Sequence, residues 1–247
     1  MEVTIGEIVV CRGLNLSLQP GERLAILGRN GIGKTTLLLT LAGLRPPRVG
    51  EVRLCGTSYL ELSTRAQALR RGVLAQTQSD AFTSSVLDAA LVGRHPHLGR
   101  WDWESADDER IARAALAAVG LECMGEREVH TLSGGERQRL AIAVLLVQQP
   151  RLFLLDEPLA HLDLNHQIAV LELFARRARE ERVGAAMVLH DVNLAARYCD
   201  RVLLVLGGGE TLLGTTDQVL QADTLSRLYG HGLRVLHDGE HRHFVPL

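Results

Sequence analysis

The sequence predicts an α/β fold with a mostly parallel sheet and an inserted helical subdomain. Three observations lead to this fold class. Short apolar runs alternate with helical patterns along most of the chain, as in proteins whose parallel strands are covered by helices. A strand, a glycine-rich turn and a helix follow one another near the N-terminus. An alanine-rich helical block interrupts the alternation in the middle of the chain.

We expect one domain over all 247 residues, a length near the upper limit for a single compact core. Residues 1–79 and 150–247 would form the α/β core, and about 80–149 the helical subdomain. In the first part of the core the expected strands are 24–27, 49–54 and 72–75, and the expected helices are 35–44 and 64–70.

The helical block contains two expected helices, 107–119 and 134–147, the second ended by Pro150. Strands and helices then alternate again. The expected elements are strand 152–155, helix 165–179, strand 185–189, a further helix and strand 202–206. The residues from 207 onward give no pattern that assigns elements.

Composition and charge exclude several classes of protein. A formal net charge of −2 gives no electrostatic reason to expect nucleic acid as a partner. No apolar run reaches the roughly 18 residues needed to span a bilayer, and the N-terminus lacks the pattern of a signal peptide, so we expect a cytoplasmic protein. The cysteines form neither a disulfide framework nor a zinc motif, and we expect all four to be buried free thiols: Cys11, Cys55, Cys123 and Cys199.

A phosphate-binding loop follows the first expected core strand. The segment G-R-N-G-I-G-K-T-T fits the pattern G-x-x-x-x-G-K-[ST], the P-loop. Its glycines let successive backbone N–H groups point at one anion, and the following helix directs its positive end at the same point. The Lys34 ammonium would reach the β- and γ-phosphates of ATP, and the Thr35 hydroxyl would bind Mg²⁺. The expected nucleotide-binding residues are Gly28, Arg29, Asn30, Gly31, Ile32, Gly33, Lys34, Thr35 and Thr36.

Two carboxylates end the buried strand 152–155. Ligands of open α/β sheets gather at the carboxyl ends of the strands, where the P-loop also lies. We expect Asp156 to hold Mg²⁺ and Glu157 to polarise the attacking water. Two neighbouring acids could instead form a solvated turn, but the P-loop in the same sheet favours a catalytic pair.

The segment T-L-S-G-G-E-R-Q-R at 131–139 decides which family the chain resembles. Ser133, Gly134 and Gly135 stand at the start of a helix, where a hydroxyl and close backbone approach are available to phosphate. A simple helix cap, with Glu136 in the first turn, is the structural alternative. Residues 132–139 match the ABC signature sequence in full, and the chain resembles the ABC ATPases over nearly its whole length.

The resemblance implies a P-loop NTPase core of the RecA type, with antiparallel β-strands at its N-terminal end, that hydrolyses ATP with Mg²⁺. It also implies a role for Gln76, the Q-loop glutamine that contacts Mg²⁺ and the attacking water, with Gln78 as the rival in a shifted register. His190 would contact the γ-phosphate. Residues 160–163 resemble the D-loop, which crosses the dimer interface.

One position departs from the family pattern. ABC ATPases usually place an aromatic ring upstream of the P-loop against adenine, near Ile5 or Glu7 in this chain, and no aromatic residue precedes Tyr59. Adenine would pack on an aliphatic side chain such as Ile5, or Tyr59 would reach it from elsewhere.

Four further segments resemble the importer subunits for iron siderophores, haem and cobalamin, with a slight preference for a corrinoid by overall similarity. They are 92–100 (V-G-R-H-P-H-L-G-R), 162–167, 190–198 and 225–230. The implied assembly is a homodimer that sandwiches two ATP molecules and drives a dimeric integral-membrane permease from the cytoplasmic face of the inner membrane. A substrate-binding protein would take part indirectly, and the permease would dock over about 76–98.

Three alternatives compete with this interpretation: a soluble ABC ATPase not coupled to transport, an unrelated P-loop kinase or GTPase, and an inactive scaffold. The first usually carries a coiled-coil insertion or a second cassette, and the second leaves the signature unexplained. The third conflicts with the filled catalytic positions. The His241 and His243 pair is expected to lie in a solvated tail and not in a metal site.

Overall fold

The central sheet of the molecule has six strands. The computed structural model describes residues 1–75, 84–239 and 241–247. The strands lie in the order β10-β9-β3-β8-β7-β6, and all neighbouring pairs are parallel except β10 with β9. Their bounds are β3 Arg23–Gly28, β6 Arg71–Leu74, β7 Leu152–Asp156, β8 Gly184–Val188, β9 Arg201–Gly207 and β10 Glu210–Thr215.

Alternate residues of β3 feed two different hydrophobic cores. Ala25 and Leu27 belong to the core under α5 (Gly134–Gln148) and α6 (Leu164–Glu181), while Leu24 and Ile26 belong to the core shared with α1 (Lys34–Leu41). This alternation follows from the two-residue period of a strand. Both faces of the strand that leads into the P-loop are therefore buried, as expected for a parallel sheet.

Three small antiparallel pairs surround the sheet, and the first confirms the expected N-terminal antiparallel strands. They are β1 (Val3–Ile5) with β2 (Ile8–Cys11), β4 (Arg53–Leu54) with β5 (Thr57–Ser58), and β11 (Leu233–Asp238) with β12 (His241–Pro246). The expected strand 49–54 is wrong in extent, because only its last two residues form a strand, and Val49 makes an isolated bridge with Glu2.

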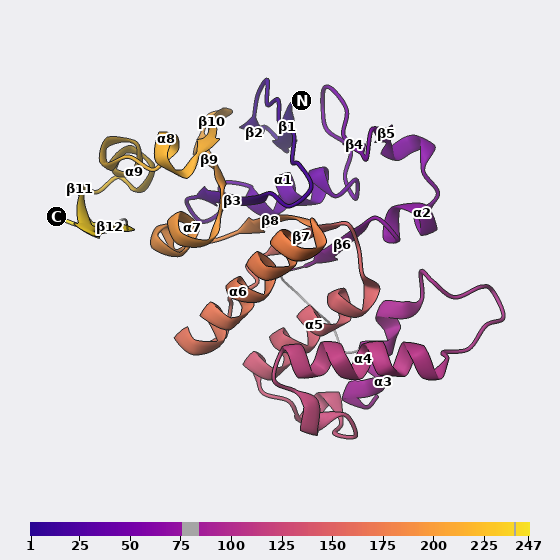
Figure 1. Cartoon of the computed structure of the whole chain (residues 1–247). Helices are drawn as coiled ribbons and strands as arrows, with labels where there is room; N and C mark the ends of the chain where they lie inside the picture. The colour runs from indigo at the N-terminus through magenta and orange to yellow at the C-terminus, as the bar shows by residue number, and fades with distance from the viewer. Residues whose placement is uncertain (76–83, 240) are drawn as a thin grey trace.

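Helices α3 (Val86–Leu91), α4 (Ala106–Ala118) and α5 pack together below the sheet in Figure 1. Ser85, Ser105 and Ser133 each cap one of these helices, and an acidic residue three positions later returns the hydrogen bond. Because these helices share one hydrophobic core with a face of the sheet, the division at residues 80 and 149 stays a prediction.

The other helical segments are short. They are α2 (Thr64–Ala68), α7 (Val192–Tyr198), α8 (Thr216–Val219), α9 (Ala222–Tyr229) and the 3-10 turns η1 (Tyr59–Glu61), η2 (Val92–Arg94), η3 (Glu122–Met124) and η4 (Val129–Thr131). Among the described residues, no helix is long and apolar enough to cross a membrane.

The C-terminal residues form a hairpin and not a tail, which corrects the expectation for His243, although its side chain is exposed. Figure 1 shows the β11–β12 hairpin beyond α9 at one side of the molecule. The Asn193 side chain in α7 donates to the Phe244 carbonyl at 3.2 Å and accepts from its N–H at 2.7 Å. The Phe244 ring is buried, so an apolar anchor and a side-chain amide hold the hairpin against α7.

Two of the four cysteines also differ from expectation. Cys11 and Cys199 are buried, whereas Cys55 and Cys123 are exposed. Cys55 lies in the turn between β4 and β5, and Cys123 lies in the turn η3, where neither has a core to enter. Within the described part of the chain, no group of three or more His, Cys, Asp or Glu side chains could hold a metal ion.

Candidate nucleotide site

The P-loop joins β3 to α1 with the backbone that the motif predicts. Gly31 and Gly33 have φ values of 75° and 103°, in the region that favours glycine. A Cβ on Gly33 would lie 2.5 Å from Val10 Cγ2 and 3.1 Å from Ile5 Cδ1. The N-terminal β1–β2 hairpin therefore packs directly on this end of the loop, and a side chain at residue 33 would push the two apart.

Lys34 occupies the centre of the loop. Its Nζ donates to the carbonyl oxygens of Gly28 at 2.9 Å and Arg29 at 3.1 Å, and the residue is only 6% exposed. Burial lowers the pKa of Lys34, while the nearby carboxylates of Glu157 and Asp156 act in the opposite direction. The site thus holds a positive charge among oxygens that a phosphate can replace as acceptors.

Asp156 and Thr35 form the part of the site that fits a magnesium ion. Asp156, at the end of β7, is 2% exposed, and burial raises its pKa while a hydrogen bond with the Thr35 side chain lowers it. Its Oδ1 is buried without a hydrogen-bond partner. A buried carboxylate oxygen left free beside a hydroxyl is a donor set suited to Mg²⁺, which takes few protein ligands when a nucleotide supplies the others.

Glu157 and His190 lie in contact. His190 Nε2 is 2.9 Å from Glu157 Oε1, and both side chains are partly exposed. Glu157 directly follows β7, and His190 is the second residue after β8. These strands are parallel neighbours, so their carboxyl ends bring the two side chains to the same edge. Glu157 also has a φ of 51°, the left-handed region that costs a non-glycine residue energy.

The signature residues open helix α5 on the surface. Ser133 caps the helix: its N–H donates to Glu136 Oε2 at 2.7 Å, and its Oγ accepts from the Glu136 N–H at 3.3 Å. Ser133 and Gly134 are exposed, and Gly135 is partly exposed. The structural alternative, a helix cap, is thus correct as far as it goes, and it leaves the serine hydroxyl and the glycine backbone facing solvent.

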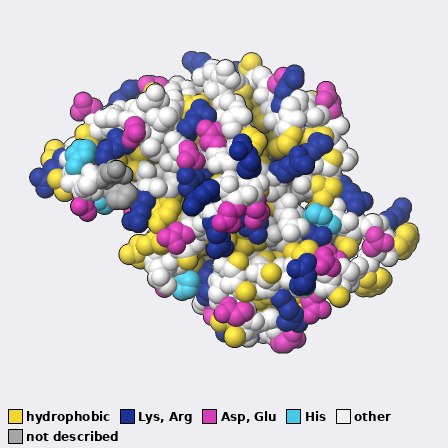
Figure 2. Space-filling model, viewed as in Figure 1, with side chains coloured by type: hydrophobic (Ala, Val, Ile, Leu, Met, Phe, Trp, Pro, Cys, Tyr) yellow, Lys and Arg dark blue, Asp and Glu magenta, His cyan; other side chains and the backbone are white. Residues whose placement is uncertain are grey.

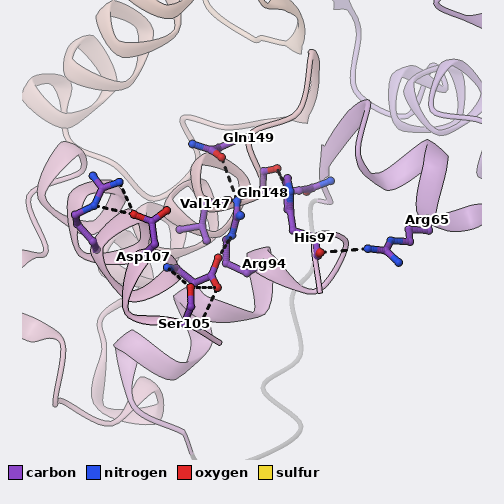
Figure 3. Close-up of polar contacts among 10 residues, drawn as sticks. Arg65, Arg94, His97, Ser105, Asp107, Val147, Gln148 and Gln149 are labelled. Carbon is purple, nitrogen blue, oxygen red and sulfur yellow. Dashed lines mark hydrogen bonds and ion pairs between the residues drawn. The ribbon is translucent and has the colours of Figure 1, made fainter. Parts of the chain in front are cut away.

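Two residues of the segment 92–100 contact the C-terminal end of α5. The buried Arg94 guanidinium donates to Asp108 Oδ1 at 2.7 Å, to the Val147 carbonyl at 3.2 Å and to Gln149 Oε1 at 3.1 Å. Figure 3 shows Arg94 directed at Val147 and Gln149, with His97 beside Gln148. The side chain of Arg94 and the imidazole of His97 thus meet the carbonyl groups that the last turn of a helix leaves unpaired.

Two sequence predictions about the site have other outcomes. Gln76 and its rival Gln78 lie outside the described residues. Tyr59 as the adenine-stacking residue is wrong: its ring is buried, a Cβ on Gly43 would lie 2.5 Å from it, and its hydroxyl donates to the Leu41 carbonyl at 3.1 Å. Tyr59 is therefore committed to the C-terminal end of α1, away from the P-loop at the other end.

Ile8 is a candidate that the sequence did not single out. It pairs with Ile5 across the β1–β2 hairpin, so the two side chains share one face, and Ile8 is 59% exposed. Ile5 itself reaches Gly33. The two short apolar segments on either side of Gly6 and Glu7 could have pointed to this aliphatic surface beside the loop.

Comparison with known proteins identifies the family. The family model described as "ABC transporter" matches residues 11–160, which include the P-loop, the signature and both carboxylates. The chain belongs to the ABC transporter family. It is an ABC-type ATPase, and ATP binding is the common property of such cassettes.

Two curated relatives of this ABC ATPase match over most of their length. The hemin import ATP-binding protein of Myxococcus xanthus is 42% identical, with 96% of this chain and 92% of the relative covered. The ferric enterobactin transport ATP-binding protein of Escherichia coli is 36% identical, with 94% and 86% covered.

Solved structures share the fold of this ABC ATPase. An inward-facing transporter assigned to the metal-chelate type superposes with a TM-score of 0.81 at 32% identity, covering 95% of this chain and 89% of that one. A dimeric ATP-binding cassette in a post-hydrolysis state, bound to ADP and Pi, gives a TM-score of 0.75 at 25% identity, covering 87% and 95%.

Proposed function

We propose that this chain is the ATP-hydrolysing subunit of an importer for haem or a related metal chelate. The observation that carries the proposal is the meeting of a P-loop, the buried Asp156 and the Glu157–His190 contact at one edge of the sheet. The cargo class follows from relatives whose names state hemin and ferric enterobactin transport. The preference for a corrinoid has no support among these relatives and stays a prediction.

Each residue of the site has a separate role in hydrolysis. The backbone N–H groups of 28–36 and Lys34 bind the phosphates, and Thr35 and Asp156 would hold Mg²⁺. When bound, Mg²⁺ neutralises charge that develops on the phosphates. Glu157 accepts a hydrogen bond from the attacking water and takes its proton, and His190 orients the Glu157 carboxylate and donates to the γ-phosphate. Gln76 keeps its role in contacting Mg²⁺ and this water as a prediction.

A homodimer completes the site. Ser133 and Gly134 are exposed and Gly135 is partly exposed, and their described polar contacts are local to the helix cap. In an isologous dimer, the signature of each protomer would close over the γ-phosphate held by its partner. The fold shared with a dimeric, ADP- and Pi-bound cassette supports this arrangement.

A dimeric permease is the partner that hydrolysis would drive, at the cytoplasmic face of the membrane, with a substrate-binding protein acting only through it. We place its docking surface over 76–98, of which 76–83 lie outside the described residues. Val92 is exposed within it, and Trp101 and Trp103, just beyond, are 84% and 87% exposed. Exposed tryptophans are typical anchors of protein interfaces.

No nucleic acid is expected as a partner. On the face in Figure 2, Lys and Arg are interspersed with Asp and Glu.

Reconstitution tests the proposal. The chain, together with a dimeric permease that co-purifies with it, is placed in liposomes and supplied with substrate-binding protein loaded with haem, a ferric siderophore or cobalamin. We expect haem or the ferric siderophore to stimulate ATP hydrolysis and uptake. Stimulation by cobalamin alone would favour the corrinoid over haem and the siderophore, stimulation by none of the three would overturn the metal-chelate cargo, and ATP hydrolysis that responds to no permease would favour the soluble ATPase.

A further inference from the structure

Gln138 links the signature helix to the catalytic carboxylate of the same protomer. It lies in the second turn of α5, five residues after Ser133. Its Nε2 donates to the Pro158 carbonyl at 3.0 Å and to the Glu157 carbonyl at 3.3 Å. Both acceptors belong to the segment that leads away from β7, so a side chain of the signature sequence holds the backbone at the catalytic position.

The backbone at this position needs support. Glu157 has a φ of 51° and His161 a φ of 62°, so the segment between β7 and α6 contains two residues in the strained left-handed region. Strained backbone persists only where the surroundings over-determine it. The two hydrogen bonds from Gln138 are fixed points of this kind, and rotation at Glu157 would carry its carboxylate away from His190.

A second contact joins the same two segments. A Cβ on Gly135 would lie 2.9 Å from the His161 carbonyl, so the signature backbone packs closely on residues 160–163. The first turns of α5 and the segment after Glu157 therefore form one packed unit. At the start of α5, this packed unit exposes Ser133 to solvent. One turn further on, the hydrogen bonds from Gln138 fix the backbone conformation of Glu157.

We infer that Gln138 is a positioning residue that sets the Glu157 carboxylate of its own protomer, although it belongs to the sequence that closes over the partner's nucleotide. The inference rests on the proposed composite site. In that dimer, ATP held by the partner would press on the tip of α5, and Gln138 would transmit the position of the helix to the Glu157 that serves the other ATP. The Gln138 side chain thereby couples the two ATP sites.

The first measurement separates positioning from signature contact. Gln138→Met keeps the length of the side chain and removes the donor. We expect its turnover at saturating ATP to fall about 10- to 100-fold, because a displacement of the order of 1 Å at a catalytic group has this effect. In the Glu157→Gln background, ATP-driven dimerisation should occur at the same ATP concentration with or without Gln138→Met.

The control for general loss of stability is Gln148→Met. Gln148 lies at the other end of α5 and also donates to two carbonyls, those of Ala68 at 2.5 Å and Arg71 at 2.8 Å. Its loss should lower the melting temperature comparably and leave turnover close to wild type. An equal fall in turnover for both variants would show a merely structural role and overturn the inference.

Mixed dimers then decide on which protomer Gln138 acts. One protomer carries Glu157→Gln and its partner keeps Glu157, and hydrolysis of bound ATP is followed over a single turnover. Gln138→Met placed in the protomer with the intact Glu157 should slow hydrolysis, whereas the same change in the Glu157→Gln protomer should not. The opposite pattern, or an equal fall in both, overturns the inference. If the mixed dimer without Gln138→Met hydrolyses ATP no better than isolated monomers do, the composite site itself is wrong.

Discussion

At the scale of single residues, the proposed chemistry depends on the carboxylate of Glu157 and the imidazole of His190. They lie 2.9 Å apart because each follows one of two neighbouring parallel strands. Lys34 and Asp156 are buried beside them. Burial lowers the pKa of Lys34 and raises the pKa of Asp156, and so favours the neutral form of each. Bound phosphate and Mg²⁺ would stabilise the charged forms, so the site is poised for its ligands.

Replacing Glu157 with Gln should preserve ATP binding and abolish most turnover. A positioned general base contributes about 10²- to 10⁴-fold to the rate, and glutamine keeps the size of the side chain without its basicity. Steady-state ATPase assays measure the loss, and size exclusion with ATP should show a persistent dimer. Near-normal turnover would remove Glu157 from this role.

Replacing Ile5 with Tyr should tighten ATP binding by about 1 kcal/mol or more, a five- to tenfold change in affinity. Ile5 and Ile8 would offer adenine an aliphatic surface without π-stacking, so wild type should also discriminate weakly between ATP and GTP. Titration with fluorescent nucleotides measures both effects. Tyr59→Ala is the control: this ring is buried at α1, so its loss should lower stability and not affinity. Unchanged affinity in Ile5→Tyr would contradict the aliphatic surface.

At the scale of elements, α5 is fixed at both ends. Gln138 joins its second turn to the segment after β7, and Arg94 and His97 meet its last carbonyls. Arg94 donates to the Val147 carbonyl while paired with Asp108, the residue that completes the cap of α4. One buried ion pair thus relates the start of α4 to the end of the signature helix.

Removing Asp108 should therefore destabilise the protein strongly. Asp108→Ala leaves the buried Arg94 without its carboxylate, and breaking such a pair costs about 3–5 kcal/mol. Asp107→Ala is the matched control, because Asp107 pairs with Arg110 on the exposed face of the same helix and should contribute less than about 1 kcal/mol. Urea unfolding of both variants measures the difference. Equal losses would contradict a special role for the buried pair.

The lowered pKa of Asp108 predicts that the free energy of unfolding falls at acid pH. Hydrogen bonds from the Ser105 backbone and hydroxyl, with the Arg94 guanidinium, lower the pKa of Asp108 from 3.8 to about 2. A carboxyl group with a lowered pKa in the folded state stabilises that state above its unfolded pKa, and this stabilisation is lost as the pH falls through about 2. The unfolding free energy of wild type should fall faster than that of Asp108→Ala between pH 4 and 2. Parallel curves would contradict this assignment.

The elements that sequence analysis placed correctly have signals that lie within a few residues. The P-loop strand and helix, the strand ending in Asp156 and the helix that Ser133 caps all depend on apolar runs, glycines and caps that are local. The β11–β12 hairpin was missed because Phe244 and Asn193 meet across 51 residues, and no local pattern states that contact. The burial of Tyr59 under Gly43 and the contact of Gln138 with Pro158 are of the same long-range kind.

At the scale of the whole molecule, the proposed composite site would make activity depend on assembly. The hydroxyl of Ser133 and the backbone of Gly134 face solvent, and in the proposed dimer a second copy would bring them to the nucleotide of the first. ATP binding and dimerisation should therefore be linked, and the ATPase rate per chain should rise with protein concentration.

Ser133→Arg should block that assembly. The arginine would occupy the space that the partner's γ-phosphate needs, so each monomer should still bind ATP while dimerisation and hydrolysis fail. Nucleotide titration and analytical ultracentrifugation measure the two properties separately. Full hydrolysis by Ser133→Arg monomers at every concentration would be incompatible with the sandwich.

The position of β3 in the middle of the sheet has a consequence for amide hydrogen exchange. Leu24, Ala25, Ile26 and Leu27 have no exposed surface, and β3 pairs on both sides with parallel strands. Their amide protons can reach solvent only when the whole domain unfolds, so their slowest exchange rates report the global free energy of unfolding. A ligand that binds only the folded state adds RT ln(1 + [L]/Kd) to that free energy. Deuterium uptake at β3, followed against ATP concentration, thus makes the strand before the P-loop a gauge of nucleotide affinity that requires neither a label on the nucleotide nor hydrolysis.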